Sequence, residues 1–298
     1  MADRVLKDIF VVPPISVLDV KQKYWKDRRK EWLSLNIQSE LGRTDNLLKM
    51  STLMRKKQKG TSVFDPVLCE VMYRWFTKPQ DTIFDPFAGG SVRGIVASKI
   101  NRKYVGVDLR EEQVIHNKLQ AKQICNAPMP KWINGDSNEV PLDFHYDFIF
   151  TCPPYYDLEQ YSDDPLDLSN MNSDDFDLVY DQILSRSIKH LSNNRFAAIV
   201  VGDVRDKSGN YLKLHHKTVD IFERNGCHYY NDLILLQEPA TAAMRSFNYM
   251  NSGRKIAKCH QNVLVFVKGD AKKATERLPK FTEDSVEKVD TGGSKLPI

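Results

Sequence analysis

The sequence predicts an α/β fold, with a mostly parallel sheet, helices on both faces and one antiparallel strand at an edge. Two observations carry this prediction. Apolar runs typical of buried strands alternate with segments of helical periodicity through residues 61–270. The last two apolar runs are joined by a loop instead of a helix, which favours an antiparallel hairpin at one edge.

The predicted elements follow one another in a regular order. Pro66 suits the start of a helix, Ser173 can cap another, and Gly226 ends a third. Apolar runs predict strands at residues 82–87, 103–110, 146–154, 195–204, 229–237 and 261–269. Helical periodicity predicts helices at residues 23–41, 64–76, 91–100, 111–125, 173–191 and 213–226.

The charges divide the chain into three parts. Residues 1–60 form a basic extension, residues 61–270 a body, and residues 271–298 a polar tail that we expect to be flexible. The extension holds 14 Lys or Arg and 7 Asp or Glu residues, whereas the whole chain has a net charge of +4, so the remainder is net negative. Such an arm suits a polyanionic partner, although a solvated helix face explains the charge equally well.

Basic and aromatic residues interleave within the predicted helix at residues 23–41, a pattern that phosphates and bases favour. For Trp32 the better interpretation is packing of this helix onto the body. The basic residues considered for phosphate contacts are Arg28, Arg29 and Lys30.

The composition excludes several classes of protein. The 298 residues are 41% hydrophobic and 28% charged, which is ordinary for a globular protein with a sizeable core. No apolar run reaches the roughly 18 residues of a membrane span, and the N-terminus has no signal-peptide pattern. Five scattered cysteines fit a reduced, cytoplasmic protein better than a disulfide framework, and they predict no metal site.

A glycine-rich turn stands between a predicted strand and helix, in the sequence I-F-D-P-F-A-G-G-S-V-R-G at residues 83–94. In such sheets, ligands bind at the carboxyl ends of the strands. Gly89 lets the backbone approach a ligand, Asp85 can accept from an amine, and Asp108 ends the next strand where ribose hydroxyls bind. A dinucleotide is disfavoured because G-x-G-x-x-G is absent. A later turn adds Asp136 and Ser137, which suit an adenine edge.

A second strand ends in the sequence I-F-T-C-P-P-Y-Y-D, at residues 149–157. With the D-P-F-A-G-G turn, it resembles the DNA amino-methyltransferases, which use S-adenosylmethionine to methylate N6 of adenine or N4 of cytosine. Asp85–Gly89 match the first motif of that family, and Cys152–Tyr155 match its catalytic motif. The resemblance covers residues 61–270 and implies a Rossmann-like methyltransferase fold, S-adenosylmethionine as cofactor and double-stranded DNA as partner.

The resemblance also implies roles for individual residues. The Cys152 side chain and the Pro153 carbonyl would accept the two amine protons, since prolines hold that carbonyl in a preorganised position. Tyr155 would stack on a base flipped out of the duplex. The implied catalytic set is Cys152, Pro153, Pro154 and Tyr155. The implied cofactor-binding set is Ser62, Phe64, Asp85, Pro86, Phe87, Gly89, Asp108, Asp136 and Ser137.

Two residues depart from the family pattern. Cys152 replaces a better acceptor and is closest in shape to serine, which is common in the cytosine-N4 enzymes, so cytosine is slightly favoured. Ser91 replaces a glycine of the first motif. Two alternatives therefore stay open. One is an RNA or protein-glutamine amino-methyltransferase, and the other is a catalytically weak methyltransferase fold that serves as a DNA-binding subunit.

Sequence recognition must come from small parts, because no recognition domain is inserted between the two motifs. We expect the basic extension and the long loop at residues 238–260 to hold DNA. A homodimer and a restriction partner are left open, as is the role of the acidic stretch Asp157–Asp181. A cytoplasmic, nucleoid-associated protein of prokaryotic or phage type is expected. The implied DNA-binding set is Arg28, Arg29, Lys30, Arg245, Arg254, Lys255 and Lys258.

Overall fold

An eight-stranded sheet organises the part of the chain that the computed structural model describes, which is residues 2–38, 64–156, 158, 161–237, 242–282 and 286. The strand order is β1-β7-β8-β6-β5-β2-β3-β4. All neighbouring pairs are parallel except those of β8, which is antiparallel to both β6 and β7. This confirms the predicted mostly parallel Rossmann-like sheet.

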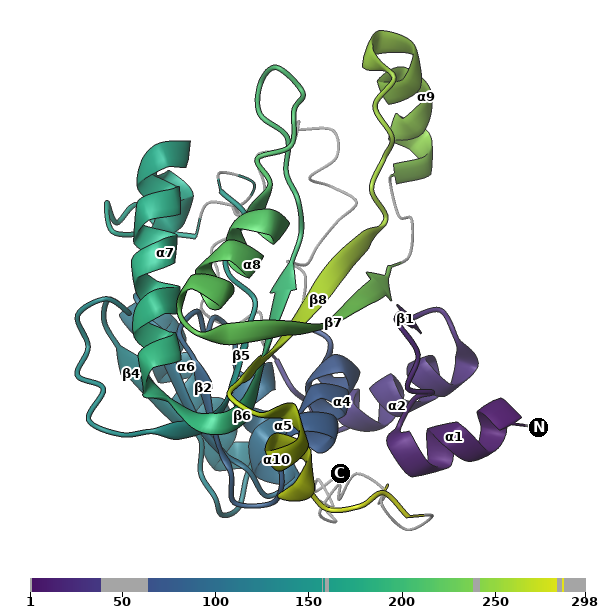
Figure 1. Cartoon of the computed structure of the whole chain (residues 1–298), viewed down its shortest axis with the longest axis vertical. Coiled ribbons are helices and arrows are strands. Elements are labelled where there is room, and N and C mark those ends of the chain that lie inside the picture. Colours follow the sequence, from purple (N-terminus) through teal and green to yellow (C-terminus); the bar gives the residue numbers. More distant parts are fainter. Residues whose placement is uncertain are drawn as a thin grey trace, which may run out of the picture.

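One half of the sheet begins at its centre and runs outward along the chain (Figure 1). Its strands carry short apolar runs that are buried by helices α5 and α6 between them. The elements are β2 (Thr82–Asp85), α5 (Val92–Lys99), β3 (Lys103–Asp108), α6 (Glu111–Ile124) and β4 (Lys131–Asn134). The sequence pattern did not reveal β4, because only Trp132 of its four residues is fully buried and so short a strand gives no clear period.

The other half of the sheet starts with β5, which lies beside β2 on the side away from β3, and its later strands extend the sheet toward the opposite edge. Its elements are β5 (Tyr146–Thr151), the short 3₁₀ helix η1 (Leu168–Asn170), α7 (Ser173–His190), β6 (Leu191–Val201), α8 (Leu214–Arg224), β7 (Cys227–Leu236) and β8 (His260–Lys268). Helix α7 begins where predicted, but its cap is Asn172, whose Oδ1 accepts from the N–H groups of Asp174 and Asp175, both at 3.0 Å. The order therefore reverses between β2 and β5, which is where such sheets bind their ligands.

The antiparallel strand does not lie at the edge where it was expected. β8 pairs on both sides, with β6 and with β7, and the outermost strand is β1 (Val17–Asp19), which is parallel to β7. A β7–β8 hairpin folds back inside the sheet here because residues 263–267 in the middle of its second strand are apolar and buried.

The basic extension is an integral part of the fold, which corrects the expected boundary at residue 60. Besides β1, it supplies α1 (Ala2–Phe10) and α2 (Lys23–Leu33), and α2 packs on α4 (Pro66–Phe76). Trp32 is fully buried, as predicted. Its Nε1 donates to the buried carboxylate of Glu70 at 2.8 Å, which also accepts from Arg28 at 2.8 and 2.6 Å.

The beginning of the tail is also ordered, contrary to the expectation for residues 271–298. Helix α10 (Ala271–Glu276) is capped by Asp270, whose side chain accepts from Lys273 N–H at 3.0 Å. Beyond it, Arg277 forms ion pairs with Asp81, at 2.5 Å, and with Asp147, at 3.5 Å. These pairs bind the segment to the end of the sheet that lies away from the ligand edge.

Helices cover both faces of the sheet, and two apolar clusters lie beneath them. One cluster joins α4, α5 and α6 to the sheet, and the other joins α7 and α8 to its opposite face. The loop expected at residues 238–260 contains another helix, α9 (Ala242–Gly253), which projects beyond the ligand edge in Figure 1. Sequence analysis interpreted this segment as a loop and did not predict α9, although Met244, Phe247 and Met250 recur at helical spacing.

Candidate active site

A cavity of about 520 Å³ opens at the carboxyl ends of β2, β3 and β5. It joins the glycine-rich turn to the proline-rich turn in one continuous space, although 62 residues separate Gly90 and Cys152 along the chain. Of the predicted site residues, it brings together Phe64, Pro86, Phe87, Gly89, Asp108, Asp136, Ser137, Cys152, Pro153, Pro154 and Tyr155. Ser62 lies outside the described residues.

Asp108 forms the polar floor of one end of this cavity, called here the cofactor end. Its carboxylate accepts from Gly89 N–H at 2.8 Å and from Arg110 N–H at 2.9 Å. Burial raises the pKa of Asp108, and these two N–H donors oppose the rise. Each carboxylate oxygen keeps a second lone pair. Asp108 can therefore accept hydroxyl groups without releasing the turn that it holds.

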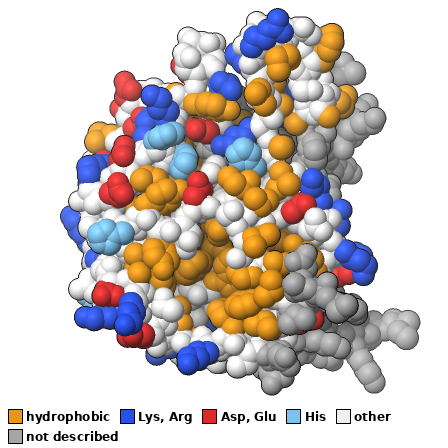
Figure 2. Space-filling model, turned by 45° about the vertical axis from the view of Figure 1, so that its right-hand side comes forward, with side chains coloured by type: hydrophobic (Ala, Val, Ile, Leu, Met, Phe, Trp, Pro, Cys, Tyr) orange, Lys and Arg blue, Asp and Glu red, His pale blue; other side chains and the backbone are white. Residues whose placement is uncertain are grey.

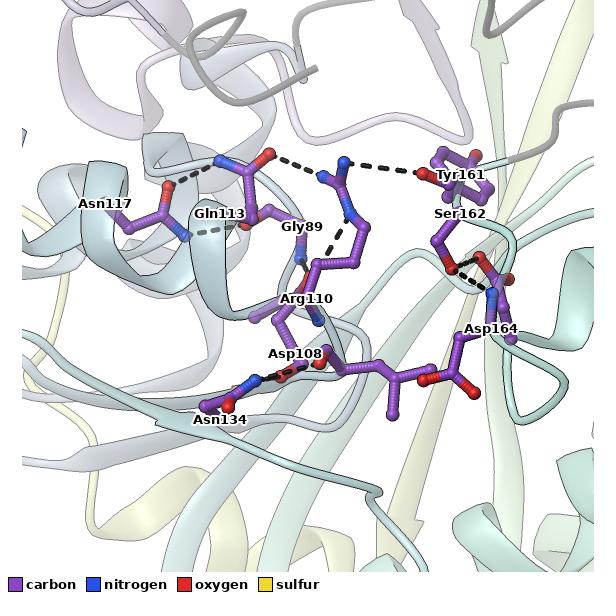
Figure 3. Close-up of polar contacts among 12 residues, drawn as sticks. Gly89, Asp108, Arg110, Gln113, Asn117, Asn134, Tyr161, Ser162 and Asp164 are labelled. Atoms are coloured by element: carbon purple, nitrogen blue, oxygen red, sulfur yellow. Dashed lines mark hydrogen bonds and ion pairs between the residues drawn. The ribbon is translucent and has the colours of Figure 1, made fainter. Parts of the chain in front are cut away.

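Three residues that sequence analysis missed hold this end in place (Figure 3). Arg110 donates to Gln113 Oε1 at 2.7 Å, Gln113 Nε2 donates to Asn117 Oδ1 at 2.9 Å, and Asn117 Nδ2 donates to the Gly89 carbonyl at 2.7 Å. This series of hydrogen bonds links α6 to the glycine turn. The sequence does contain a signal, because Gln113 and Asn117 are polar residues four apart and therefore lie on one face of the predicted helix.

Asp85 does not line the cavity, which corrects its expected contact with a cofactor amine. Its carboxylate is fully buried and accepts from Arg93 at 2.5 Å, Tyr104 at 2.7 Å and Thr151 at 2.6 Å. Burial alone would lower the pKa of Arg93, but the negative charge of Asp85 outweighs this effect and raises that pKa. Arg93 in turn donates to the Phe87 carbonyl at 2.7 Å. Asp85 thus supports the turn from beneath.

The opposite end of the cavity, called here the target end, consists of neutral groups joined by hydrogen bonds. Tyr155 Oη lies 3.2 Å from Cys152 Sγ and accepts from Gln261 Nε2 at 2.8 Å. Gln261 Oε1 accepts from Gln237 Nε2 at 2.9 Å. Burial raises the pKa of Tyr155 well above its ordinary value, so the hydroxyl stays protonated. Both glutamines line the cavity and were not predicted.

Gly202, directly after β6, leaves the space that the Tyr155 ring occupies. A Cβ atom at position 202 would lie 3.0 Å from Cε2 of that ring, closer than side chains normally approach. The absence of a side chain here is therefore a steric requirement of Tyr155. Sequence analysis could not find it, because the contact joins the ends of two strands.

The residues predicted to bind DNA do not form one group. Arg28 is buried in its ion pairs with Glu70 and Glu31, so its role is structural and its expected DNA contact is corrected. Arg29 is partly exposed and lines the mouth of the cavity, and Lys30 is exposed beside it on α2. Arg245 and Arg254 are exposed in or just after α9, whereas Lys255 and Lys258 are partly buried at its base.

The acidic stretch has an internal explanation. Asp167 accepts from the Ser169 N–H at 2.9 Å and from Ser162 Oγ at 2.8 Å, and so shapes the turn before η1. Asp177 pairs with Lys217, and Asp181 pairs with Arg224 at 2.8 Å, so that both join α7 to α8. Much of this charge therefore stabilises the fold itself.

The fold and the cavity define the class of S-adenosylmethionine-dependent methyltransferases. The site fits this cofactor: Asp108 keeps acceptor capacity for ribose hydroxyls, Gly89 has a positive φ of 50° that lets the turn pass close to a ligand, and Phe87 supplies an apolar wall.

The family comparison makes this more specific. Residues 14–118 match the N6/N4 family model described as DNA methylase, which confirms the resemblance to the DNA amino-methyltransferases. The matched segment begins within the extension, which agrees with its place in the fold, and it ends ahead of Cys152.

Solved structures of similar fold have low sequence identity. TrmN from Thermus thermophilus is 15% identical with a TM-score of 0.46, over 68% of this chain and 48% of TrmN, so the chain spans about half of TrmN. Magnesium protoporphyrin IX methyltransferase from Synechocystis, with bound S-adenosylmethionine, is 12% identical with a TM-score of 0.46, over 73% and 89%. A methyltransferase from Pyrococcus furiosus is 16% identical with a TM-score of 0.46, over 72% and 87%.

None of the helices in the described part of the chain combines the length and apolar character needed to span a membrane. In the same part of the chain, no three His, Cys, Asp or Glu side chains gather closely enough to hold a metal ion.

Proposed function

We propose that this protein transfers a methyl group from S-adenosylmethionine to an exocyclic amine of a base flipped out of double-stranded DNA, with cytosine N4 favoured over adenine N6. One observation carries the proposal: the Cys152–Tyr155 turn and the carboxylate of Asp108, which we assign to the ribose hydroxyls, line the same cavity. An amine held at this turn would lie in the space that the cofactor shares.

The chemistry of the target end suits an amine. An exocyclic amine is a poor nucleophile because its lone pair is delocalised into the ring. The Pro153 carbonyl and Cys152 Sγ would accept its two protons and so favour a tetrahedral nitrogen. When bound, S-adenosylmethionine supplies an electrophilic methyl group on a cationic sulfur. The amine would take up that methyl group and lose one proton to solvent, while Cys152 Sγ and the Pro153 carbonyl hold its hydrogen atoms.

Tyr155 gives the base a second contact. Its ring lies between Gly202 and the cavity, and its hydroxyl is fixed by Gln261, so its orientation is set before a base arrives. A preoriented aromatic ring can stack on any flipped base. Positioning would then account for much of the rate, because cofactor and amine are held in line.

Cationic residues at the mouth of the cavity support DNA as the substrate. Lys26 and Arg29 of α2 line the cavity, and Lys30 lies exposed on the same helix. Cations at a cavity mouth favour phosphates and give a salt-dependent affinity. Substituting Arg29 and Lys30 by alanine should reduce the slope of log affinity against log salt by about 2, at roughly one unit per phosphate contact.

Nucleoside analysis tests the proposal directly. Duplex DNA of mixed sequence is incubated with the protein and isotopically labelled S-adenosylmethionine, then digested to nucleosides and analysed by mass. Label in N4-methyldeoxycytidine is expected, and label in N6-methyldeoxyadenosine would keep the reaction but reverse the base preference. Label in 5-methyldeoxycytidine, or only in RNA or protein offered in parallel, would contradict the proposal.

A further inference from the structure

Helix α9 is a surface element that no other described part of the chain covers along most of its length. Among its residues with a described environment only Ala242 is buried, and residues 243–253 are all exposed. Met244 and Phe247 are each 74% exposed and Met250 is 42% exposed. A helix of twelve residues is marginal alone in water. Contact with a partner would therefore stabilise α9.

The residues of α9 form two faces. Met244, Phe247 and Met250 follow one another at intervals of three and share one side of the helix. Asn248 borders Met244, four residues before it, and Arg245 and Tyr249 lie next to Asn248, with the Arg245 guanidinium 5.8 Å from the centre of the Tyr249 ring. Figure 2 shows hydrophobic and basic side chains together on this projection, at the top of the molecule. The partner must therefore offer both apolar and acceptor groups.

The charge around α9 identifies the kind of partner. Residues 242–259, which are α9 and the segment that leads to β8, contain four Lys or Arg residues and no Asp or Glu. A second copy of this chain would place these cations against one another across a symmetric interface. A polyanion would instead be attracted along the whole segment. Nucleic acid is thus a better partner for this surface than another copy of the protein.

The position of α9 relates it to the cavity. Gln237 directly follows β7, the strand before α9, and Gln261 is the second residue of β8, the strand after it; both glutamines line the target end. At the base of α9, Lys255 packs against Gly209 so closely that a Cβ there would lie 2.4 Å from Lys255 Nζ. The helix therefore projects from a fixed base at the rim through which a target base would enter.

We propose that α9 is the sequence-reading helix of this protein and lies in the major groove of double-stranded DNA beside the target base. The major groove is wide enough for a helix, whereas the minor groove is not. Arg245 and Asn248 present the donors that recognise guanine and adenine, and Phe247 and Met244 present apolar groups for thymine methyls. This inference rests on the proposed function, since it takes double-stranded DNA as the substrate.

Selection from a random duplex pool tests this inference without depending on catalysis. The full-length protein, with S-adenosylhomocysteine, is expected to enrich a short motif, and dimethyl sulfate should then reveal a protected guanine N7 in the major groove. Arg245→Ala should lose that protection and weaken discrimination at that base pair at least about tenfold. Lys272→Ala, an exposed cation on α10 at the opposite edge of the sheet, is the matched control and should retain both.

The apolar face has its own pair of variants. Phe247→Ser should reduce enrichment at a T·A pair, whereas Leu178→Ser, at an exposed leucine on α7, should change nothing. Failure of the wild-type protein to enrich any motif, or unchanged specificity in Arg245→Ala and Phe247→Ser, would overturn the assignment of α9. A wild-type dimer that Phe247→Ser converts to a monomer would also overturn it, and would assign α9 to self-association. Motif enrichment without labelled nucleoside would contradict the proposed function alone.

Discussion

The two ends of the cavity are built in different ways. At the cofactor end, Asp108 is held by backbone N–H groups, and buried side chains fix the glycine turn from α6 and from beneath. At the target end, Tyr155 belongs to a network of neutral side chains that open toward the base of α9. The first end is rigid and charged, whereas the second is neutral and formed by residues from four separate segments.

This difference separates what the class requires from what this chain adds. Any S-adenosylmethionine site at a sheet edge needs a close turn and a ribose acceptor, and local sequence supplies both. Selection of a base needs contacts shaped to one substrate, and these come from distant segments. Substitutions at the cofactor end should therefore abolish cofactor binding, whereas those at the target end should reduce methyl transfer and leave cofactor binding intact.

The largest effect is expected for Asp108→Ala. Hydrogen bonds to a charged group contribute about 1.5–3 kcal/mol each, so loss of two ribose contacts should weaken S-adenosylmethionine binding at least about 100-fold. Isothermal titration calorimetry measures this loss, and duplex DNA affinity should stay unchanged. Asp136→Asn, on the cavity wall, is the control and should lose less. Wild-type cofactor affinity in Asp108→Ala would remove the basis for calling this the cofactor end.

Next in size is the effect of Cys152→Ala. Removing one preorganised acceptor from a developing charge costs about 10²–10³ in rate in comparable sites, and a thiol as the weaker acceptor places this loss at the lower limit. Cys152→Ser should keep its activity, because a hydroxyl accepts better in the same space. Single-turnover methyl transfer measures both. If Cys152→Ala turns over at the wild-type rate, the Pro153 carbonyl suffices alone.

Gly202→Ala should have a smaller effect, of the same kind as Tyr155→Ala. A Cβ at 3.0 Å from the Tyr155 ring must displace it, and loss of base stacking in Tyr155→Ala is expected to cost about 1–3 kcal/mol. Both variants should bind S-adenosylmethionine normally by calorimetry and bind the target duplex more weakly. Gly226→Ala is the control for space alone, since nothing lies within 4 Å of its Cβ position, although its φ of 80° carries strain. If Gly202→Ala binds the target duplex with wild-type affinity, Tyr155 tolerates displacement.

The sequence predicted the cofactor end far better than the target end. Strand, turn and acidic residue follow one another within 24 residues from Asp85 to Asp108, so their chemistry is visible in local order. Only Asp85 was placed wrongly there, because a carboxylate next to a turn can equally face inward to an arginine. At the target end, Gly202 and Gln261 lie 47 and 106 residues beyond Tyr155, and no local pattern connects them to it.

The same reasoning explains the errors at the two ends of the chain. Charge suggested that residues 1–60 were an arm and that Arg28 was free for phosphates, but Glu70, buried on α4, could not be identified as its partner before the fold was known. Likewise, Arg277 in the polar tail meets Asp81, which is 196 residues away. Charged residues whose partners are distant in sequence look solvated until topology brings them together.

The smallest expected effect tests the hydrogen bond that joins Gln261 to Tyr155. Gln261→Ala removes the donor at 2.8 Å from Tyr155 Oη, and Tyr155→Phe removes the acceptor but keeps the ring for stacking. A net hydrogen bond is worth about 0.5–1.5 kcal/mol, so each change should lower kcat/KM about 2- to 10-fold. If the two act through this one bond, the double variant should be no worse than either single variant. Additive losses would show that Gln261 acts on the base or on Gln237 instead. Cofactor affinity should be equal in all four proteins of the cycle, because neither residue lies at the cofactor end.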